Sequence, residues 1–458
     1  MNGSISNISS LVAIIASAAG DIESYYKTST SKPGVPSLDD TDPHPLDNAI
    51  YPPTVRHAVQ VLEGACAQLC ATVASPGSTL LNRFLSAYQP TCISVALRGC
   101  IADVLLAEPT GMPVSEISKR CGVEEQKLGR VLRLLCSHHI FREVRKDVFA
   151  NNRLSMQLLS SNPISSIGLH LADEPGNKAA SFLTETLLDP EWGPSYAPEL
   201  SAFNRSTGYT HPLWLYFEGK DSKKGAEQGA RFARGMIGWN NSISAEAIVT
   251  DFPWAKLPKG AIVNDVGGGW GNIAMQLYRR YPNLNMKLQD LPERIRQARN
   301  EAWPKECPEA IADSRIEFRS IDLLQESPIQ NCDIYLLKNV IHSWSNDAAV
   351  KALENIRKAM SPASRLLVYE YIIQNTNRVP VNESEFQQAP LPLLPNFGAG
   401  RIRQYYLDLA VMALTNSGER RLDDYIRLAT AAGLKLVDVW DLGEMGVMEF
   451  AVEALMGT

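Results

Sequence analysis

One histidine and two glutamates in the C-terminal half of the chain stand where they could act together in acid–base chemistry. His342 follows the apolar run 332–337, Glu370 ends the run 364–370, and Glu419 lies 49 residues further on. An imidazole titrates near neutral pH, and a carboxylate that holds one ring nitrogen raises the basicity of the other. A single histidine is more often structural than catalytic, but the two carboxylates favour a catalytic role for this one.

A glycine-rich turn precedes these residues and could receive a small ligand. Residues 265–271 read Asp-Val-Gly-Gly-Gly-Trp-Gly and lie between an apolar run and a helical pattern. Glycine has no side chain in the way, so the backbone can approach a ligand closely. A dinucleotide fingerprint needs Gly-x-Gly-x-x-Gly, and its third glycine position is Asn272 here. The compact spacing of Gly267 and Gly269 behind Asp265 suits an adenosyl ligand without a pyrophosphate, with an ordinary tight turn as the alternative.

Two aspartates follow the next two strand candidates. Asp290 lies 25 residues after Asp265, at the end of the second strand, and Asp322 follows the third. Ligands of open α/β sheets bind beyond the carboxyl ends of the strands, where both acids are expected. Asp290 can accept hydrogen bonds from both ribose hydroxyls there, and Asp322 or an adjacent amide can meet the adenine amino group. Either acid alone could be an exposed loop residue, but two at these offsets favour a ligand site.

The elements that must position these residues alternate from residue 260 onward. Strands are expected at 261–266, 284–289, 315–318, 332–337, 364–370, 434–440 and 447–452, and helices at 272–280, 292–302, 347–360 and 421–432. This alternation predicts a mostly parallel sheet wrapped by helices. Only residues 441–446 separate the last two strands, which should therefore form an antiparallel hairpin. Seven strands with a terminal hairpin are the plan of the α/β, Rossmann-like fold of class I methyltransferases.

The pattern of the chain predicts four segments. Residues 1–53 hold a helix and a Pro/Ser-rich connector, 54–164 a helical winged-helix-like domain, 165–250 a helical substrate-pocket segment, and 251–458 the sheet domain. A winged helix can bind DNA, but its second helix here lacks the density of basic residues that phosphate contacts demand. A packing or dimerisation role is favoured, and a DNA-binding regulator is the weaker alternative.

Composition further limits the classes of partner that the chain is expected to bind. The 458 residues carry a net charge of -6, which argues against nucleic acid. The eight cysteines form no Cys-x-x-Cys pair or Cys/His cluster, so no metal site is expected, and they fit a cytoplasmic location. The apolar segment 11–16 is far shorter than the ~20 residues that span a bilayer, so no membrane partner is expected.

Together these motifs resemble those of the plant and fungal small-molecule O-methyltransferases of the caffeate/flavonoid type. The similarity covers roughly residues 55–455: the winged-helix region, the glycine turn, a Lys-x-x-x-His-x-Trp segment at 338–344 and Gly-Glu-Arg at 418–420. The long N-terminal segment is similar to that of fungal members. The resemblance implies S-adenosyl-L-methionine as the cofactor, a small-molecule substrate and a homodimer.

The resemblance also implies roles for individual residues. Seven are expected at the cofactor: Asp265, Gly267, Gly269, Asp290, Asp322, Leu323 and Lys338. Among them, Asp290 holds the ribose, Asp322 and Leu323 flank the adenine, and Lys338 reaches the polar end.

His342 is implied to be the general base, with Glu370 and Glu419 flanking it. Its spacing of 28 residues to Glu370 agrees with the family pattern. Two positions depart from that pattern, since Ser343 replaces a usual aspartate and Ala233 a common asparagine. At both positions the family's substrate contacts do not carry over directly to this chain, whereas the cofactor site is unaffected.

Methyl transfer to a hydroxyl is the first mechanistic hypothesis. A phenol near pKa 10 and a histidine near 6.5 differ by about 3.5 units, so complete prior proton transfer costs roughly 5 kcal/mol. Proton removal should therefore accompany attack, and phenols or enols suit this base better than aliphatic alcohols.

The acceptor is expected to be a large apolar or aromatic secondary metabolite, such as a fungal polyketide-type product. Met236, His170 and Met412 are expected to contact it. The alternative is a pericyclase or dehydratase on the same scaffold, in which Lys338 and His170 polarise a carbonyl while the cofactor keeps its methyl group.

Overall fold

The computed structural model describes residues 7–243, 245–380, 384 and 386–453. The chain divides into two compact units. The helical unit comprises Met1–Ser244, Ala389–Gly400 and Met412–Asn416, and the sheet unit comprises Ala245–Gln388, Arg401–Val411 and Ser417–Thr458. Within the described residues, no helix combines the length and the apolar character that crossing a bilayer requires.

The helical unit contains both long and short helices and one small sheet. Its helices are α1 (Asn7–Thr28), α2 (Pro53–Val73), α3 (Pro76–Leu85), α4 (Tyr88–Arg98), α5 (Ile101–Leu105), α6 (Val114–Cys121), α7 (Glu125–Ser137), η1 (Ser155–Leu158), α8 (Pro163–Leu171), α9 (Gly176–Ser181), α10 (Leu183–Leu187), α11 (Ala202–Thr207), α12 (Leu213–Glu218) and α13 (Lys223–Ser242). Its strands are β1 (Met112–Pro113), β2 (Arg142–Arg145) and β3 (Val148–Ala150).

Helices α6 and α7 with the three short strands form the predicted winged helix. The turn between the helices passes through Gly122, whose φ of 76° strains any residue with a side chain. The Glu124 carboxylate then caps α7, because it accepts hydrogen bonds from the backbone N–H groups of Gln126 and Lys127 at 3.0 and 2.9 Å. Strand β3 pairs antiparallel with both β1 and β2, which confirms the hairpin.

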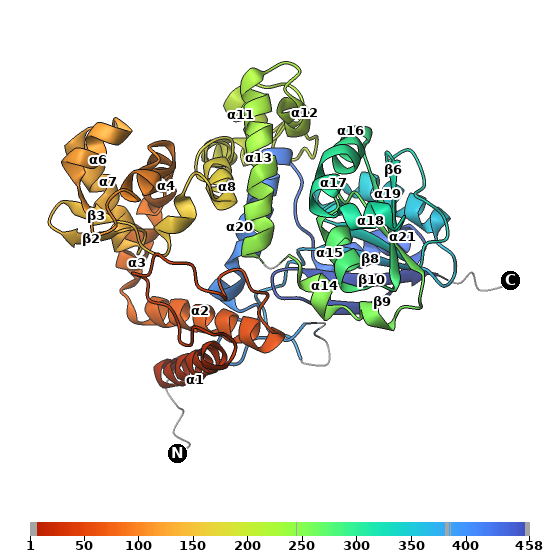
Figure 1. The fold of residues 1–458 in the computed structure, drawn as a ribbon, viewed down its shortest axis with the longest axis horizontal. Coiled ribbons are helices and arrows are strands. Elements are labelled where there is room, and N and C mark those ends of the chain that lie inside the picture. Colours follow the sequence, from red (N-terminus) through yellow and green to blue (C-terminus); the bar gives the residue numbers. More distant parts are fainter. Residues whose placement is uncertain (1–6, 244, 381–383, 385, 454–458) are drawn as a thin grey trace. The chain divides into compact units, whose positions relative to one another are not determined.

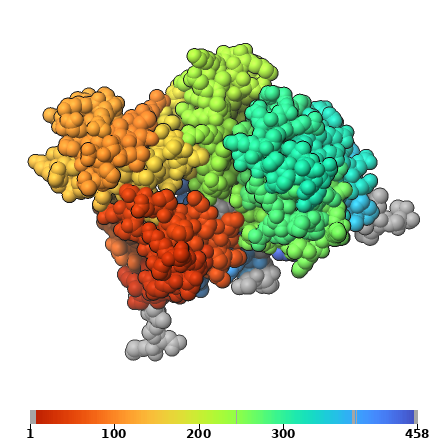
Figure 2. Space-filling model, viewed as in Figure 1, coloured from red at the N-terminus to blue at the C-terminus, as the bar shows by residue number. Residues whose placement is uncertain are grey.

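The N-terminal helix belongs to the core of the helical unit. Leu11 of α1, Ala65 of α2 and Phe397 share one buried cluster, and Figure 2 shows the surface of α1 and α2 in red. Residues 29–52, all of them described, form no helix or strand, as expected for a connector. The connector is nevertheless packed, because His44 is only 3% exposed.

The sheet unit contains the alternating elements. Its strands are β4 (Ala261–Val266), β5 (Leu284–Asp290), β6 (Ile316–Ser320), β7 (Ile334–Lys338), β8 (Arg365–Glu370), β9 (Leu434–Asp441) and β10 (Gly446–Val452). Its helices are α14 (Ala247–Asp251), η2 (Trp254–Lys256), α15 (Asn272–Arg280), α16 (Pro292–Gln297), η3 (Ala298–Ala302), α17 (Trp303–Glu306), α18 (Pro308–Ala312), η4 (Ile341–Ser343), α19 (Asn346–Ala359) and α21 (Leu422–Ala431). Two further helices, η6 (Gly398–Arg401) and α20 (Ile402–Thr415), run across the boundaries between the units.

The seven strands form one sheet in the order β6-β5-β4-β7-β8-β10-β9. Figure 1 labels β8, β10 and β9 of this sheet next to one another. Neighbouring strands from β6 to β8 are parallel, and β10 is antiparallel to both β8 and β9. This confirms the α/β fold class and the terminal hairpin. The predicted strand at 315–318 extends to Ser320, because pairing with β5 continues through Asp290 opposite Ser320.

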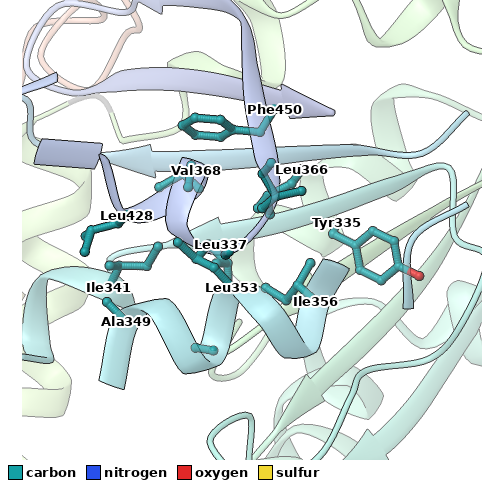
Figure 3. Close-up of a cluster of buried hydrophobic side chains, with 14 of the residues drawn as sticks. Tyr335, Leu337, Ile341, Ala349, Leu353, Ile356, Leu366, Val368, Leu428 and Phe450 are labelled. Atoms are coloured by element: carbon teal, nitrogen blue, oxygen red, sulfur yellow. The ribbon is translucent and has the colours of Figure 1, made fainter. Parts of the chain in front are cut away.

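A continuous apolar cluster holds α19 and α21 on the sheet (Figure 3). Leu353 and Ile356 of α19 and Leu428 of α21 pack with Leu337 of β7 and Val368 of β8. Full burial of such a side chain contributes roughly 1.5–3 kcal/mol. The cluster therefore fixes the carboxyl ends of β7 and β8, where the acid–base residues follow.

Candidate active site

The glycine turn after β4 has the backbone conformation that its sequence predicts. Gly267 and Gly269 adopt φ angles of 72° and 60°, in the left-handed region that favours glycine. A Cβ atom at Gly267 would lie 2.7 Å from Val340 Cγ2, whereas one at Gly269 would meet no atom within 4 Å. The turn is therefore packed against protein on one side and open at Gly269.

Two aspartates support this turn. Asp290 Oδ2 accepts a hydrogen bond from the Gly269 N–H at 2.8 Å, and its Oδ1 accepts one from the Leu291 N–H at 2.6 Å. Burial raises the pKa of Asp290, and these two bonds oppose that rise. Burial likewise raises the pKa of Asp265 to about 7, while the Lys338 ammonium opposes the shift. A carboxylate has about four lone-pair sites, so Asp290 keeps acceptor capacity for a ligand.

The predicted adenine-flanking pair lies beyond β6, where the sequence placed it. Asp322 is exposed, and its Oδ1 accepts a hydrogen bond from the Leu324 N–H at 3.0 Å. Leu323 is 7% exposed and belongs to the apolar cluster of the sheet, while its carbonyl accepts a hydrogen bond from Asn355 Nδ2 at 2.9 Å. The two side chains therefore differ, with the carboxylate open to solvent and the leucine largely in the core.

Lys338 ends β7 and interacts electrostatically with nearby acidic residues. Burial lowers the pKa of its ammonium group, and the carboxylates of Asp265 and Glu370 oppose the shift. These interactions link the glycine turn to the acid–base residues through one central lysine.

The turn that carries His342 is held by Glu370. Asn339 has a φ of 53°, after which the chain enters η4. Glu370 is fully buried at the end of β8, and its Oε1 accepts hydrogen bonds from the N–H groups of Val340 and Ile341 at 2.8 and 2.9 Å. Glu370 thus satisfies two backbone donors of this turn, a structural contribution that the sequence did not reveal.

Glu419 contacts the imidazole itself. The Nδ1 atom of His342 lies 2.7 Å from Glu419 Oε1, and the Glu419 side chain is 0% exposed. When Nδ1 carries a proton, its N–H donates a hydrogen bond to the carboxylate. Nε2 is then the ring nitrogen that can accept a further proton. Burial alone would lower the pKa of His342, but the charges of Glu419 and Glu370 outweigh burial and raise the pKa to about 9.

These three side chains could serve either a metal ion or a proton. One ligand atom from each of His342, Glu370 and Glu419 lies within 4.8 Å of the others, which makes them a possible metal-binding group among the described residues. However, Nδ1 and Oε1 are 2.7 Å apart, closer than the ~3.3 Å between two donors on a tetrahedral zinc with bonds of ~2.0–2.1 Å. The observed geometry is that of a hydrogen bond, so it favours acid–base chemistry.

Three residues around this pair were not recognised from the sequence. Asp408 Oδ1 accepts a hydrogen bond from the Glu419 N–H at 2.8 Å, and Ser417 Oγ donates to the His342 carbonyl at 2.7 Å. Arg420, which the sequence marks only as part of the Gly-Glu-Arg motif, donates hydrogen bonds to backbone carbonyls of the same turn. The Gly-Glu-Arg motif was the available signal for Arg420, whereas nothing marked Asp408 in the helical pattern of α20.

The three predicted substrate contacts belong to the helical unit. His170 in α8 is 2% exposed, and its ring centre lies 4.8 Å from that of Phe232. Burial lowers the pKa of His170 to about 3, with Arg231 adding to the effect, so its imidazole is neutral at pH 7. Met236 lies in α13 and Met412 near the end of α20. Their contact with a substrate stays a prediction.

Comparisons with known proteins agree with this fold. The O-methyltransferase domain model matches residues 197–435, and the O-methyltransferase dimerisation domain model matches residues 81–161. "3-O-methyltransferase 2" of Phanerochaete chrysosporium is 38% identical over 447 residues, which are 97% of this chain and 97% of that protein. That match therefore includes most of the N-terminal segment.

Solved structures share the fold over most of the chain. The mitomycin 7-O-methyltransferase MmcR is 22% identical, with a TM-score of 0.64 over 84% of this chain and 99% of its own. A structure described as "A Pericyclic Reaction enzyme" is 18% identical, with a TM-score of 0.67 over 96% of this chain and 99% of its own.

The chain belongs to the O-methyltransferase family, as the domain model and the relative show. It is an enzyme that transfers a methyl group from S-adenosyl-L-methionine to oxygen, which confirms the predicted activity class and cofactor. It also carries the family's dimerisation domain.

Proposed function

We propose that this enzyme methylates a phenolic or enolic hydroxyl of an aromatic secondary metabolite, with His342 as the general base. The observation that carries the proposal is the pair of His342 Nδ1 and the buried Glu419 Oε1 at 2.7 Å. A carboxylate on one ring nitrogen holds the tautomer and strengthens the other nitrogen as a base.

The cofactor residues proposed are those predicted from the sequence: Asp265, Gly267, Gly269, Asp290, Asp322, Leu323 and Lys338. The open space at Gly269 fits a ligand that approaches the backbone, and Asp290 keeps lone pairs for ribose hydroxyls. S-adenosylmethionine, when bound, supplies an electrophilic methyl group, so the chain's own residues need only orient the acceptor and take its proton.

The raised pKa of His342 makes that proton transfer easier than the sequence suggested. With a pKa of about 9, the imidazole lies about one unit below a phenol near 10, so the transfer costs roughly 1.4 kcal/mol. With the unperturbed histidine pKa near 6.5, the same proton transfer costs roughly 5 kcal/mol. Glu419 and Glu370 thus remove most of this cost, while an aliphatic alcohol remains far too weak an acid.

The acceptor class is proposed from two observations. The relative from Phanerochaete chrysosporium is named for transfer to a numbered oxygen, 3-O. The helical unit also holds an aromatic cluster in which Phe217 and Phe232 stack with ring centres 5.5 Å apart, beside His170 and Trp214. Such rings suit a flat, aromatic acceptor such as a polyketide-type product.

A homodimer is part of the proposal. Helix α3 and the start of α4 present large apolar side chains to solvent: Leu81 is 60% exposed, Phe84 71%, Leu85 58% and Tyr88 63%. These residues lie within the segment matched by the dimerisation domain model. A contiguous exposed apolar face of this kind marks a protein–protein contact.

His342→Ala tests the base. We expect kcat to fall by roughly 10²–10⁴-fold while the Kd for S-adenosylmethionine, measured by calorimetry, stays within a factor of two or so, because the histidine acts on the acceptor. His138→Ala, which removes an exposed imidazole, serves as the control. A His342→Ala enzyme with wild-type turnover on a panel of phenols would remove this residue from the role.

The pericyclase alternative is tested in the same assay. The similarity to a pericyclic enzyme is one of fold, and the retained His342–Glu419 pair supports methyl transfer instead. With methyl-labelled cofactor, we expect the label to appear in the product. Product that forms while the label stays in the cofactor would establish the alternative.

A further inference from the structure

The segment 417–420 holds the turn of His342 at several points. Ser417 Oγ donates to the His342 carbonyl at 2.7 Å, and Glu419 Oε1 lies 2.7 Å from the imidazole Nδ1. Arg420 completes the set through hydrogen bonds to backbone carbonyls of the same turn. One short segment therefore contacts both the backbone and the side chain of the proposed base.

The Arg420 guanidinium group spans the turn. Its Nη1 donates to the Ile341 carbonyl at 2.9 Å, its Nη2 to the Trp344 carbonyl at 2.5 Å, and its Nε to Asn346 Oδ1 at 3.1 Å. These acceptors lie before and after His342 along the chain. Arg420 is only 9% exposed, so water competes little for the carbonyls.

The backbone of Arg420 is fixed as well. Its carbonyl accepts a hydrogen bond from the Ile373 N–H at 3.0 Å, just beyond β8, and the preceding Glu419 N–H is held by Asp408 at 2.8 Å. A Cβ atom at Gly418 would lie 2.8 Å from Asp408 Oδ1, so a side chain there would displace the carboxylate that holds Glu419. The guanidinium group therefore projects from an anchored position.

We infer that Arg420 is a positioning residue for methyl transfer. It fixes the His342 turn so that the imidazole keeps both its contact with Glu419 and its orientation toward the acceptor. This inference rests on the proposed role of His342. A planar guanidinium group reaches two carbonyls at once, which a lysine ammonium cannot do in the same geometry. A displacement of about 1 Å at a catalytic group can cost roughly 10²-fold in rate.

The test compares Arg420→Ala, Arg420→Lys and the control Arg427→Ala, which removes an exposed arginine paired with Asp424 on α21. We expect Arg420→Ala to lower kcat by roughly 100-fold, with little change in the KM for S-adenosylmethionine, and Arg420→Lys to fall between it and wild type. Millimolar guanidinium chloride should restore part of the Arg420→Ala activity, because the buried space left behind accepts the ion. The control should show neither effect.

The pH profile separates positioning from a general loss of structure. When the turn loosens, His342 loses its contact with Glu419, so the pH at which kcat levels off should fall in Arg420→Ala and Arg420→Lys. A kcat within threefold of wild type, or activity that guanidinium does not restore, overturns the inference. If circular dichroism shows that Arg420→Ala does not fold, Arg420→Lys decides through its kcat and pH profile.

His342→Ala, assayed in parallel, distinguishes the two proposals. If His342→Ala keeps wild-type activity, the proposed base is wrong whatever Arg420 does. If it is inactive while the Arg420 variants behave like wild type, only the positioning role is wrong.

Discussion

Replacing Glu419 by glutamine removes the charge that faces the proposed base. The change keeps the side chain's size but loses the carboxylate 2.7 Å from His342 Nδ1. The rise in the His342 pKa from 6.5 to about 9 corresponds to about 3 kcal/mol of preference for the imidazolium in the folded protein. Without Glu419, the pKa of His342 should fall back toward its ordinary value, because burial acts against the charged form and only the charge of Glu370 then opposes it.

Activity and stability should both report this change. For the wild type, kcat/KM for the acceptor should rise with pH, be half-maximal near pH 9 and level off above it, since the base must lose its proton. In Glu419→Gln the rise should occur at lower pH than in the wild type, and the plateau should be lower by roughly 10²–10⁴-fold, because the base is weaker and its tautomer is no longer held.

The sign of the stability effect follows from the direction of the pKa shift. A folded-state pKa raised above the unfolded value stabilises the fold fully below about pH 6.5, and that stabilisation is lost as pH rises through about 9. The wild type should therefore lose about 3 kcal/mol of unfolding free energy over this window, and Glu419→Gln should not. Denaturant unfolding between pH 6 and 10 measures this pH dependence of the unfolding free energy. Glu354→Gln, on the exposed face of α19, serves as the control. Identical pH profiles for wild type and Glu419→Gln would refute the reasoning.

Three further predictions concern other parts of the molecule. Asp290→Asn should weaken S-adenosylmethionine binding by roughly 10- to 100-fold in calorimetry, because hydrogen bonds to a charged group are lost; an unchanged Kd would argue against ribose binding there. The affinity for this cationic cofactor should rise between pH 6 and 8 as Asp265 ionises with a pKa of about 7, and Asp265→Asn should abolish the rise; a slope that persists in the variant would assign it elsewhere. Phe84→Glu should convert a dimer to a monomer in light scattering after gel filtration, since it places a charge on the exposed apolar face of α3; a variant that stays dimeric would place the interface elsewhere.

Local pattern was sufficient for much of this protein. Alternating apolar runs predicted seven strands and the terminal hairpin, because burial on a pleated sheet imposes its own periodicity on the sequence. The glycine turn was predicted equally well, since left-handed backbone at Gly267 and Gly269 favours residues without a side chain. Strand ends were less accurate, because pairing such as that of Asp290 with Ser320 depends on the neighbouring strand.

The arrangement of the acid–base residues was decided by tertiary structure. Glu419 and His342 are 77 residues apart, and no periodicity predicts that one carboxylate holds the imidazole while Glu370 holds the backbone before it. The basicity of His342 depends on burial and on charges from three separate segments, and Arg420 acts through carbonyls that every residue carries. Sequence alone determined which chemical groups are present and at which edge of the sheet they lie, whereas their distances and proton affinities arose only when the folded chain excluded water around them.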